Sequence, residues 1–244
     1  MVSDPAATAD ATCDPLLRGR IRVWQPRRGH RVTLDALVLA DFARRGAGGR
    51  VLDLGCGAGV IAVALLAGDP AATGVGVELQ PELADLARRN VTENGLEGRL
   101  EIVAGDLRRP LELGAFDVVV ANPPYHPGRG RAAPDAERAV ARHEVECTIA
   151  DVAAATRRHL APKGRAFLVY PAERVAELLA ACAAASVPAR ALRFVHSVAD
   201  EPARRVLVEA APGWRGGVTV LAPLVVHGDD RKSYRPEAAR ILGD

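Results

Sequence analysis

Several patterns that define whole classes of protein are absent from this sequence. Its four cysteines are spread along the chain at spacings typical of neither a zinc site nor a thioredoxin-type motif, so no disulfide framework is expected. No run of apolar residues approaches the ~18 that a membrane-spanning helix needs. Residues 1–14 have neither a basic start nor an apolar run, so they do not resemble a secretory signal peptide. We therefore expect a cytoplasmic protein with no membrane partner.

Lysine and aromatic residues are also scarce. Only Lys163 and Lys232 are lysines among the 32 basic residues, and aromatic residues make up 4% of the chain. The formal net charge of +2 gives no support for a nucleic-acid partner at the level of the whole molecule. Residues 15–34 nevertheless contain no acidic side chain and carry His30 and six arginines: Arg18, Arg20, Arg22, Arg27, Arg28 and Arg31.

The length and apolar content favour one domain with a large core. The chain has 244 residues, of which 49% are apolar. We expect residues 1–15 to form a disordered tail and residues 16–240 to form a single domain. Within it, residues 16–45 are predicted to form a hairpin and a helix, 46–212 the core, and 213–244 a C-terminal extension.

Apolar runs alternate with helical stretches from about residue 49 to 210, which is typical of an α/β fold with helices on both faces of a mostly parallel sheet. Helices are predicted at 58–68, 81–94, 148–160 and 172–185. The link at 197–203 is too short for a helical crossover, so the last strand is expected to be antiparallel. The seven predicted strands are 49–54, 73–78, 99–104, 115–121, 164–170, 190–196 and 204–210.

Shorter elements are expected on either side of this core. Residues 20–32 are typical of a small arginine-rich hairpin, and a helix is predicted from Thr33 to about Arg44, with Thr33 as its cap. Residues 218–226 are expected to form a strand, and the polar segment 230–244 is predicted to contain one or two helical turns. The connection at 122–146 has no clear periodicity.

A glycine turn follows the first predicted core strand. Gly55, Gly57 and Gly59 allow the backbone to turn sharply and to approach a ligand closely. The spacing departs from the dinucleotide fingerprint because Val60 follows Gly59, and Asp53 would repel a pyrophosphate but suit a cationic ligand. The pattern favours a nucleotide-like cofactor, with a purely structural turn as the alternative.

Acidic residues end the next two strands. Glu78 stands where a carboxylate accepts hydrogen bonds from ribose hydroxyls in doubly wound folds. Asp106 follows the third strand, in a position to accept from an adenine amine. Each acidic residue alone is typical of a solvated strand end. Together, Asp53, Glu78 and Asp106 stand at three successive strand ends, which favours a shared site.

The fourth strand ends in Asn122, Pro123, Pro124 and Tyr125. One interpretation is a turn stiffened by its prolines. The chemical interpretation is that the Asn122 side-chain oxygen and the Pro123 carbonyl accept from one planar NH2 group while the Tyr125 ring stacks on it. Such acceptors localise the nitrogen lone pair, so no strong general base is required.

The motifs at 51–60, 76–81, 104–107 and 122–125 resemble those of class I S-adenosylmethionine-dependent methyltransferases. The NPPY tetrad is similar to enzymes that methylate the exocyclic amine of adenine in nucleic acid or the glutamine amide of release factors. Residues 25–43 and 224–238 resemble the flanking segments of the bacterial tRNA(Val) adenine-37 N6-methyltransferases.

This resemblance implies a monomeric Rossmann-like domain that methylates N6 of the adenosine beside the anticodon in tRNA, with no obligate protein partner. It also implies that Asp53, the turn from Gly55 to Gly59, Glu78, Asp106 and Asn122 bind S-adenosylmethionine. Residues 122–125 would then hold the target base.

The arginines are candidate RNA contacts. Arg27, Arg28 and Arg31 lie in the positive strip, and Arg129 and Arg131 follow the tetrad. No spacing pairs His126 or His143 with another ligand, so no metal is expected. Two alternatives stay open: a protein-glutamine N5-methyltransferase using the same tetrad, and a non-catalytic RNA-binding module that keeps the fold.

Overall fold

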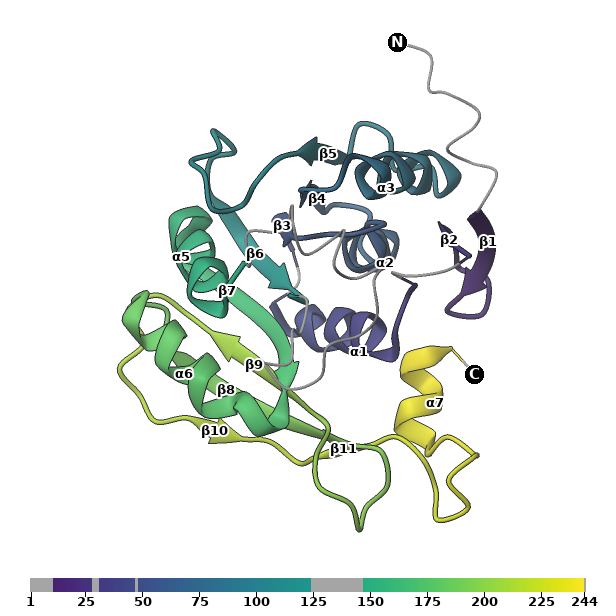
Figure 1. Cartoon of the computed structure of the whole chain (residues 1–244), viewed down its shortest axis with the longest axis vertical. Helices are drawn as coiled ribbons and strands as arrows, with labels where there is room; N and C mark the ends of the chain where they lie inside the picture. The colour runs from purple at the N-terminus through teal and green to yellow at the C-terminus, as the bar shows by residue number, and fades with distance from the viewer. Residues whose placement is uncertain (1–10, 28–30, 47, 124–146, 244) are drawn as a thin grey trace, which may run out of the picture.

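The structure, a computed structural model of the chain, describes residues 11–27, 31–46, 48–123 and 147–243. Its centre is a sheet in the order β10-β8-β9-β7-β6-β3-β4-β5 (Figure 1). β11 also pairs with β8, further along that strand than β10. The long strands are β3 (Arg50–Leu54), β4 (Thr73–Glu78), β5 (Leu100–Ala104), β6 (Phe116–Ala121), β7 (Leu160–Pro171), β8 (Ala189–His196) and β9 (Arg205–Ala210).

Helices cover both faces of this sheet, as Figure 1 shows. One apolar cluster joins one face of the sheet to α1 (Leu34–Ala43), α2 (Val60–Gly68) and α3 (Pro81–Glu93). A second cluster joins the other face to α5 (Ile149–His159) and α6 (Val175–Ala184), the latter preceded by the 3-10 turn η3 (Ala172–Arg174). Helices lie on both faces because β3, β4 and β6 bury side chains on each face of the sheet, and each face therefore needs a helical layer to cover it.

The strand pairing confirms the predicted fold class. β5, β4, β3, β6 and β7 are parallel neighbours, whereas β9 is antiparallel to both β7 and β8. The predicted strands and helices agree with the observed ones within a few residues, and β7 begins earlier than expected, directly after α5.

The predicted count of seven strands omits two short ones. β10 (Thr219–Val220) and β11 (Leu224–Val225) both pair in parallel with β8, so residues from the predicted C-terminal extension extend the main sheet. Pro223 lies between them and has no N–H for a ladder hydrogen bond, which explains why the apolar run at 218–226 does not form one strand. The segment ends in α7 (Pro236–Leu242), which confirms the helical turns predicted there.

The N-terminal hairpin begins earlier than predicted. β1 (Ala11–Leu16) pairs with β2 (Ile21–Pro26), and η2 (Arg44–Gly46) follows α1. Residues 11–15 were expected in a disordered tail and instead form a strand, because β2 offers them a full antiparallel ladder. Residues 1–10 lie outside the described part of the chain. The α1 helix starts at the predicted cap, Thr33, although the Thr33 side chain makes no capping hydrogen bond.

None of the helices in the described residues combines the length and apolar character that crossing a bilayer requires.

Candidate cofactor and substrate site

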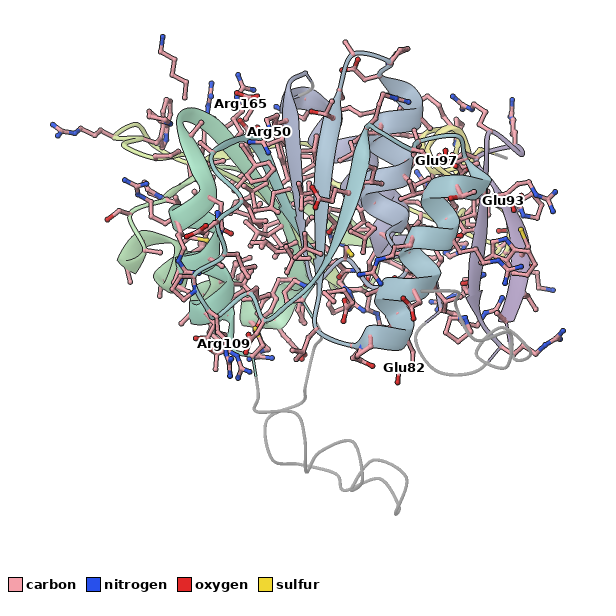
Figure 2. All side chains as sticks on the ribbon, turned by 90° about the horizontal axis from the view of Figure 1, so that it is seen from above. Arg50, Glu82, Glu93, Glu97, Arg109 and Arg165 are labelled. Carbon is pink, nitrogen blue, oxygen red and sulfur yellow. The ribbon has the colours of Figure 1, made fainter. Side chains whose placement is uncertain are left out.

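The predicted site residues come together at one end of the sheet. Asp53, Glu78 and Asn122 lie at the carboxyl ends of β3, β4 and β6, and Asp106 follows β5, so four neighbouring strands supply them. Figure 2 shows this end marked by Arg109 and Glu82, with Arg50 and Arg165 at the opposite end. The crevice outside the carboxyl ends of parallel strands is where α/β folds bind their ligands.

The glycine turn has the backbone that its sequence predicts. Gly55, Gly57 and Gly59 have φ of 69°, 55° and 79°, values that L side chains rarely adopt. The Gly55 and Cys56 N–H groups donate to the Val77 carbonyl at 2.9 and 3.0 Å, which ties the turn to β4. A Cβ on Gly55 or Gly57 would meet no atom within 4 Å, so the space beside the turn is open to a ligand.

Asp53 is fully buried beside this turn. Its Oδ2 accepts from the Ala62 N–H of α2 at 3.2 Å, while Oδ1 has no hydrogen-bond partner within the described residues. Burial, with a further contribution from the nearby charge of Glu78, raises the pKa of Asp53 to about 7. A buried carboxylate with one unused oxygen is suited to a cationic or hydrogen-bond-donating ligand.

Glu78 spans the mouth of the turn. Its Oε2 accepts from the Gly57 N–H at 2.8 Å and its Oε1 accepts from the Gln80 N–H at 2.9 Å. These bonds hold the carboxylate in one orientation and leave further lone pairs on both oxygens. The arrangement fits the expected role of accepting from a ribose.

Asp106 has a neighbour that the sequence did not reveal. Both of its oxygens accept from the Arg108 guanidinium, at 2.7 to 3.1 Å, and its Oδ1 also accepts from the Arg108 N–H. These hydrogen bonds lower the pKa of Asp106. An adenine amine would therefore share this carboxylate with Arg108, so the adenine role of Asp106 stays a prediction.

The tetrad is described only in its first half. Asn122 is half-buried and Pro123 is buried at the end of β6, whereas Pro124 and Tyr125 lie outside the described residues. The described half is consistent with two acceptors at the mouth of the site. Base stacking by Tyr125 stays a prediction.

The candidate RNA contacts fall into two groups. Arg31 donates to Asp14, Thr12 and the Pro26 carbonyl, so much of its hydrogen-bonding capacity is used within the hairpin, while Arg27 is exposed. The other candidate contacts, Arg28, Arg129 and Arg131, lie outside the described part of the chain, as do His126 and His143.

No group of three or more His, Cys, Asp or Glu side chains in the described ranges is arranged to hold a metal ion, and the expectation of no metal stays a prediction. A separate cavity of about 280 Å³ lies at the amino ends of the strands, lined in part by Ala43, Arg44, Val51 and Val118. The glycine turn lies at the other end of β3, so this cavity is not part of the candidate site.

The sheet order, the glycine turn and the acidic strand ends agree with the resemblance to class I S-adenosylmethionine-dependent methyltransferases that the sequence motifs show. The family model for the methyltransferase small domain matches residues 33–178, and the chain belongs to this family. A crystal structure of a predicted O-methyltransferase from Agrobacterium tumefaciens has a TM-score of 0.69 and 25% identity, covering 85% of this chain and 95% of that one.

Relatives that match most of the chain have more specific names. The tRNA1(Val) (adenine(37)-N6)-methyltransferase of Porphyromonas gingivalis is 31% identical over 226 residues, 86% of each chain. The enzyme of that name from Aeromonas hydrophila is 32% identical over 80% of this chain and 82% of its own. The release factor glutamine methyltransferase of Rhodospirillum rubrum is 43% identical, but over only 42% of this chain and 32% of its own. The resemblance inferred from the sequence is thus confirmed.

The protein is therefore an enzyme that uses S-adenosylmethionine. Three features of the described residues fit this cofactor: the open face of the glycine turn, the unpartnered buried oxygen of Asp53, and the fixed carboxylate of Glu78. A sulfonium cation and an amino group are both compatible with this acidic lining. Which atoms each residue contacts stays a prediction.

Proposed function

We propose that the protein methylates N6 of adenine in tRNA, at a position near the anticodon. The observation that carries this proposal is the match to tRNA adenine-N6-methyltransferases over 86% of the chain, with Asn122 and Pro123 at the end of β6 beside the acidic strand ends. We further propose that it acts as a cytoplasmic monomer without an obligate protein partner.

In this proposal each residue has a distinct task. Asp53, Glu78, Asp106 and the glycine turn bind the cofactor, which supplies a methyl group whose C–S bonding electrons stay with sulfur. Asn122 Oδ1 and the Pro123 carbonyl accept the two hydrogens of the adenine amine, which directs the nitrogen lone pair away from the ring. One of these protons leaves to solvent as the N6–C bond forms.

The test is transfer of radiolabelled methyl from S-adenosylmethionine to total bacterial tRNA, followed by nucleoside analysis. Labelled N6-methyladenosine is the expected product. Label in release factor but not in RNA would replace this proposal with glutamine methylation. Cofactor binding with no label in tRNA, ribosomal RNA, DNA or release factor would support a non-catalytic RNA-binding module.

Asn122 gives the sharpest test of the chemistry. Asn122→Ala should lower the single-turnover methyl-transfer rate by ~100-fold or more, by analogy with deletion of one preorganised polar group. Cofactor affinity, measured on the same protein by calorimetry, should change much less. Full turnover with normal cofactor binding would disprove the mechanism.

Protein-glutamine methylation is the weaker second candidate. The two release factor glutamine methyltransferases match 42% and 41% of this chain, whereas the tRNA enzyme of Porphyromonas gingivalis matches 86% of it. The arginine residues of the hairpin suit a phosphate backbone better than an uncharged glutamine loop.

A further inference from the structure

The outer edge of β2 is paired with a helix. β1 covers one edge of β2, and two asparagines of the α3 region cover the other. Asn94 accepts from the Arg22 N–H at 2.9 Å and donates to the Arg22 carbonyl at 2.8 Å. Asn90 accepts from the Trp24 N–H at 2.6 Å and donates to the Trp24 carbonyl at 2.9 Å. Two amide side chains, four residues apart, thus replace a neighbouring strand.

Further contacts fix the hairpin in this position. Glu93 accepts from the Arg22 Nε and the Trp24 Nε1, each at 3.0 Å, and the Arg89 guanidinium carbon lies 3.2 Å from the centroid of a Trp24 ring. Figure 2 shows Glu93 on the side of α3 that faces the hairpin. On its inner face β2 buries Ile21 and Val23 in the core cluster that contains α2.

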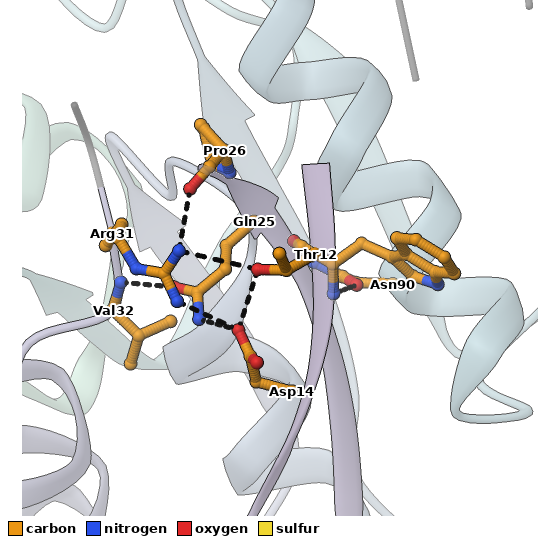
Figure 3. Close-up of polar contacts among 8 residues, drawn as sticks. Thr12, Asp14, Gln25, Pro26, Arg31, Val32 and Asn90 are labelled. Carbon is orange, nitrogen blue, oxygen red and sulfur yellow. Dashed lines mark hydrogen bonds and ion pairs between the residues drawn. The ribbon is translucent and has the colours of Figure 1, made fainter. Parts of the chain in front are cut away.

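A polar network joins the other side of the hairpin to the start of α1. The buried Gln25 donates to Asp14 at 2.6 Å and accepts from the Val32 N–H at 2.8 Å, and Arg31 donates to the same carboxylate (Figure 3). The hairpin is therefore anchored on both sides and is built into the domain.

Asn90 differs from Asn94 in one contact. It is fully buried, and its Nδ2 also donates to the Ala58 carbonyl at 2.8 Å. Ala58 lies between Gly57 and Gly59 in the glycine turn. The third Asn94 contact is instead with the Asn90 carbonyl, within α3. Asn90 is thus hydrogen-bonded to both the hairpin and the turn, whereas Asn94 is bonded only to the hairpin and its own helix.

The turn depends on such anchors for its shape. Its N–H groups are held by Val77 and Glu78, and on the α3 side a Cβ on Gly59 would approach the Ala87 Cβ to 3.3 Å. Three positive-φ glycines at alternate positions have a large conformational freedom to lose when a ligand binds. A bond that fixes the Ala58 peptide reduces that loss in advance.

We propose that Asn90 is a positioning residue for the cofactor, and that through it the N-terminal hairpin and the cofactor turn stabilise each other. Docking of the hairpin orders the glycine turn and so raises cofactor affinity. By reciprocity, bound cofactor holds the hairpin more firmly on α3. This inference rests on the proposed contact between the glycine turn and S-adenosylmethionine.

The test compares Asn90→Ala with Asn94→Ala as a matched control, by calorimetric titration with S-adenosylmethionine in the absence of RNA. Both variants lose two hydrogen bonds to the hairpin, but only Asn90→Ala loses the bond to the turn. We expect Asn90→Ala to raise the cofactor Kd about tenfold or more and Asn94→Ala to change it less than about threefold. Equal effects of the two variants, or an unchanged Kd for Asn90→Ala, would overturn the proposal.

Asn90→Asp is the second variant and guards against loss of folding. It keeps the size of the side chain and the acceptor for Trp24, but replaces the Nδ2 donor with an oxygen facing two carbonyls. If Asn90→Ala does not fold, Asn90→Asp must still weaken cofactor binding at unchanged secondary structure. Tight binding by the aspartate variant would refute the role of the Ala58 bond.

Reciprocity has its own measurement. In a Trp214→Phe background Trp24 is the single tryptophan, so the tryptophan fluorescence of that protein comes from the hairpin alone. Saturating S-adenosylmethionine should raise the protection of the residue 22 and 24 amides from hydrogen exchange in wild type but not in Asn90→Ala. If S-adenosylmethionine binds but RNA is not methylated, the proposed function fails while this inference stands; failure of wild type to bind the cofactor removes both.

Discussion

Asp53 is a carboxylate whose burial opposes folding. Its pKa in the folded protein, about 7, lies above the value near 4 expected in the unfolded chain. Between these values the folded state binds more protons than the unfolded state, so this residue makes stability fall as pH rises from about 4 to 7. Above pH 7 the full cost of the buried charge is present.

Asp53→Asn should therefore stabilise the protein while weakening its function. We expect the cofactor-free variant to be more stable than wild type by roughly 1–3 kcal/mol at pH 8, and by much less at pH 4.5, because the asparagine carries no charge. Urea unfolding at the two pH values measures this difference. S-adenosylmethionine affinity should fall by about tenfold or more at pH 8. A stability difference that is the same at both pH values would contradict the buried-charge explanation.

Glu78 is expected to act mainly in binding. Glu78→Ala should weaken S-adenosylmethionine binding by about 1.5–3 kcal/mol for each ribose hydrogen bond that is lost. It also removes the acceptor for the Gly57 and Gln80 N–H groups. Glu78→Gln, which retains one acceptor oxygen, should lose less. Calorimetric titration separates the two, and an alanine variant that binds as tightly as wild type would exclude the ribose role.

At the scale of elements, α5 has the most complete helix start in the described residues. Thr148 accepts from the Asp151 N–H, and the Asp151 carboxylate accepts from the Thr148 N–H, which forms a capping box. The helix packs against the second core cluster through Ile149 and Val152, so its start is coupled to the domain.

Thr148→Ala should destabilise the protein by about 0.5–2 kcal/mol, because loss of the cap leaves the Asp151 N–H without its acceptor in the first turn. Thr92→Ala, at an exposed position of α3, is the control and should change stability by no more than about 0.5 kcal/mol. The urea concentrations at the unfolding midpoints, compared at a fixed slope of free energy against urea, measure both changes in stability. Equal effects of the two substitutions would show that the capping box does not contribute.

The core elements could be predicted from sequence because their signals are local. The parallel strands are continuous apolar runs, and Pro81 marks the first turn of α3. β1 could not be predicted, since residues 11–15 carry no large apolar side chain and are ordered by their ladder to β2. The division of the apolar run at 218–226 has a local signal in Pro223, whereas the pairing of both parts with β8 has none.

The same distinction applies to the site. Asp53, Glu78 and Asp106 could be found because each follows a recognisable strand. Arg108 was missed because a salt bridge between residues two apart depends on the loop conformation. Asn90 was missed because its partners are distant in sequence, although the spacing of Asn90 and Asn94 does place them on one face of α3.

At the scale of the whole molecule, RNA binding should depend on local charge, since the net charge is only +2. Each arginine that neutralises a phosphate adds about 0.9 to the slope of log affinity against log salt for a duplex, and about 0.7 for a single strand. Arg129→Ala with Arg131→Ala should lower this slope by about 1–2 if both residues bind phosphate. Arg157→Ala, an exposed control in the last turn of α5, should leave it unchanged. Filter binding to tRNA over a range of salt measures the slopes; equal slopes for all three proteins would remove these arginines from the interface.

The position of β9 governs how the molecule is made. β9 follows β7 and β8 in the chain but lies between them in the sheet, so both remain unpaired on that side until about 40 more residues after β7 have been synthesised. At typical elongation rates this interval lasts roughly 2–8 s. During it the nascent chain exposes two apolar strand edges, which are templates for aggregation and for chaperone capture. Completion of the sheet during translation thus waits for one of its latest strands to leave the ribosome.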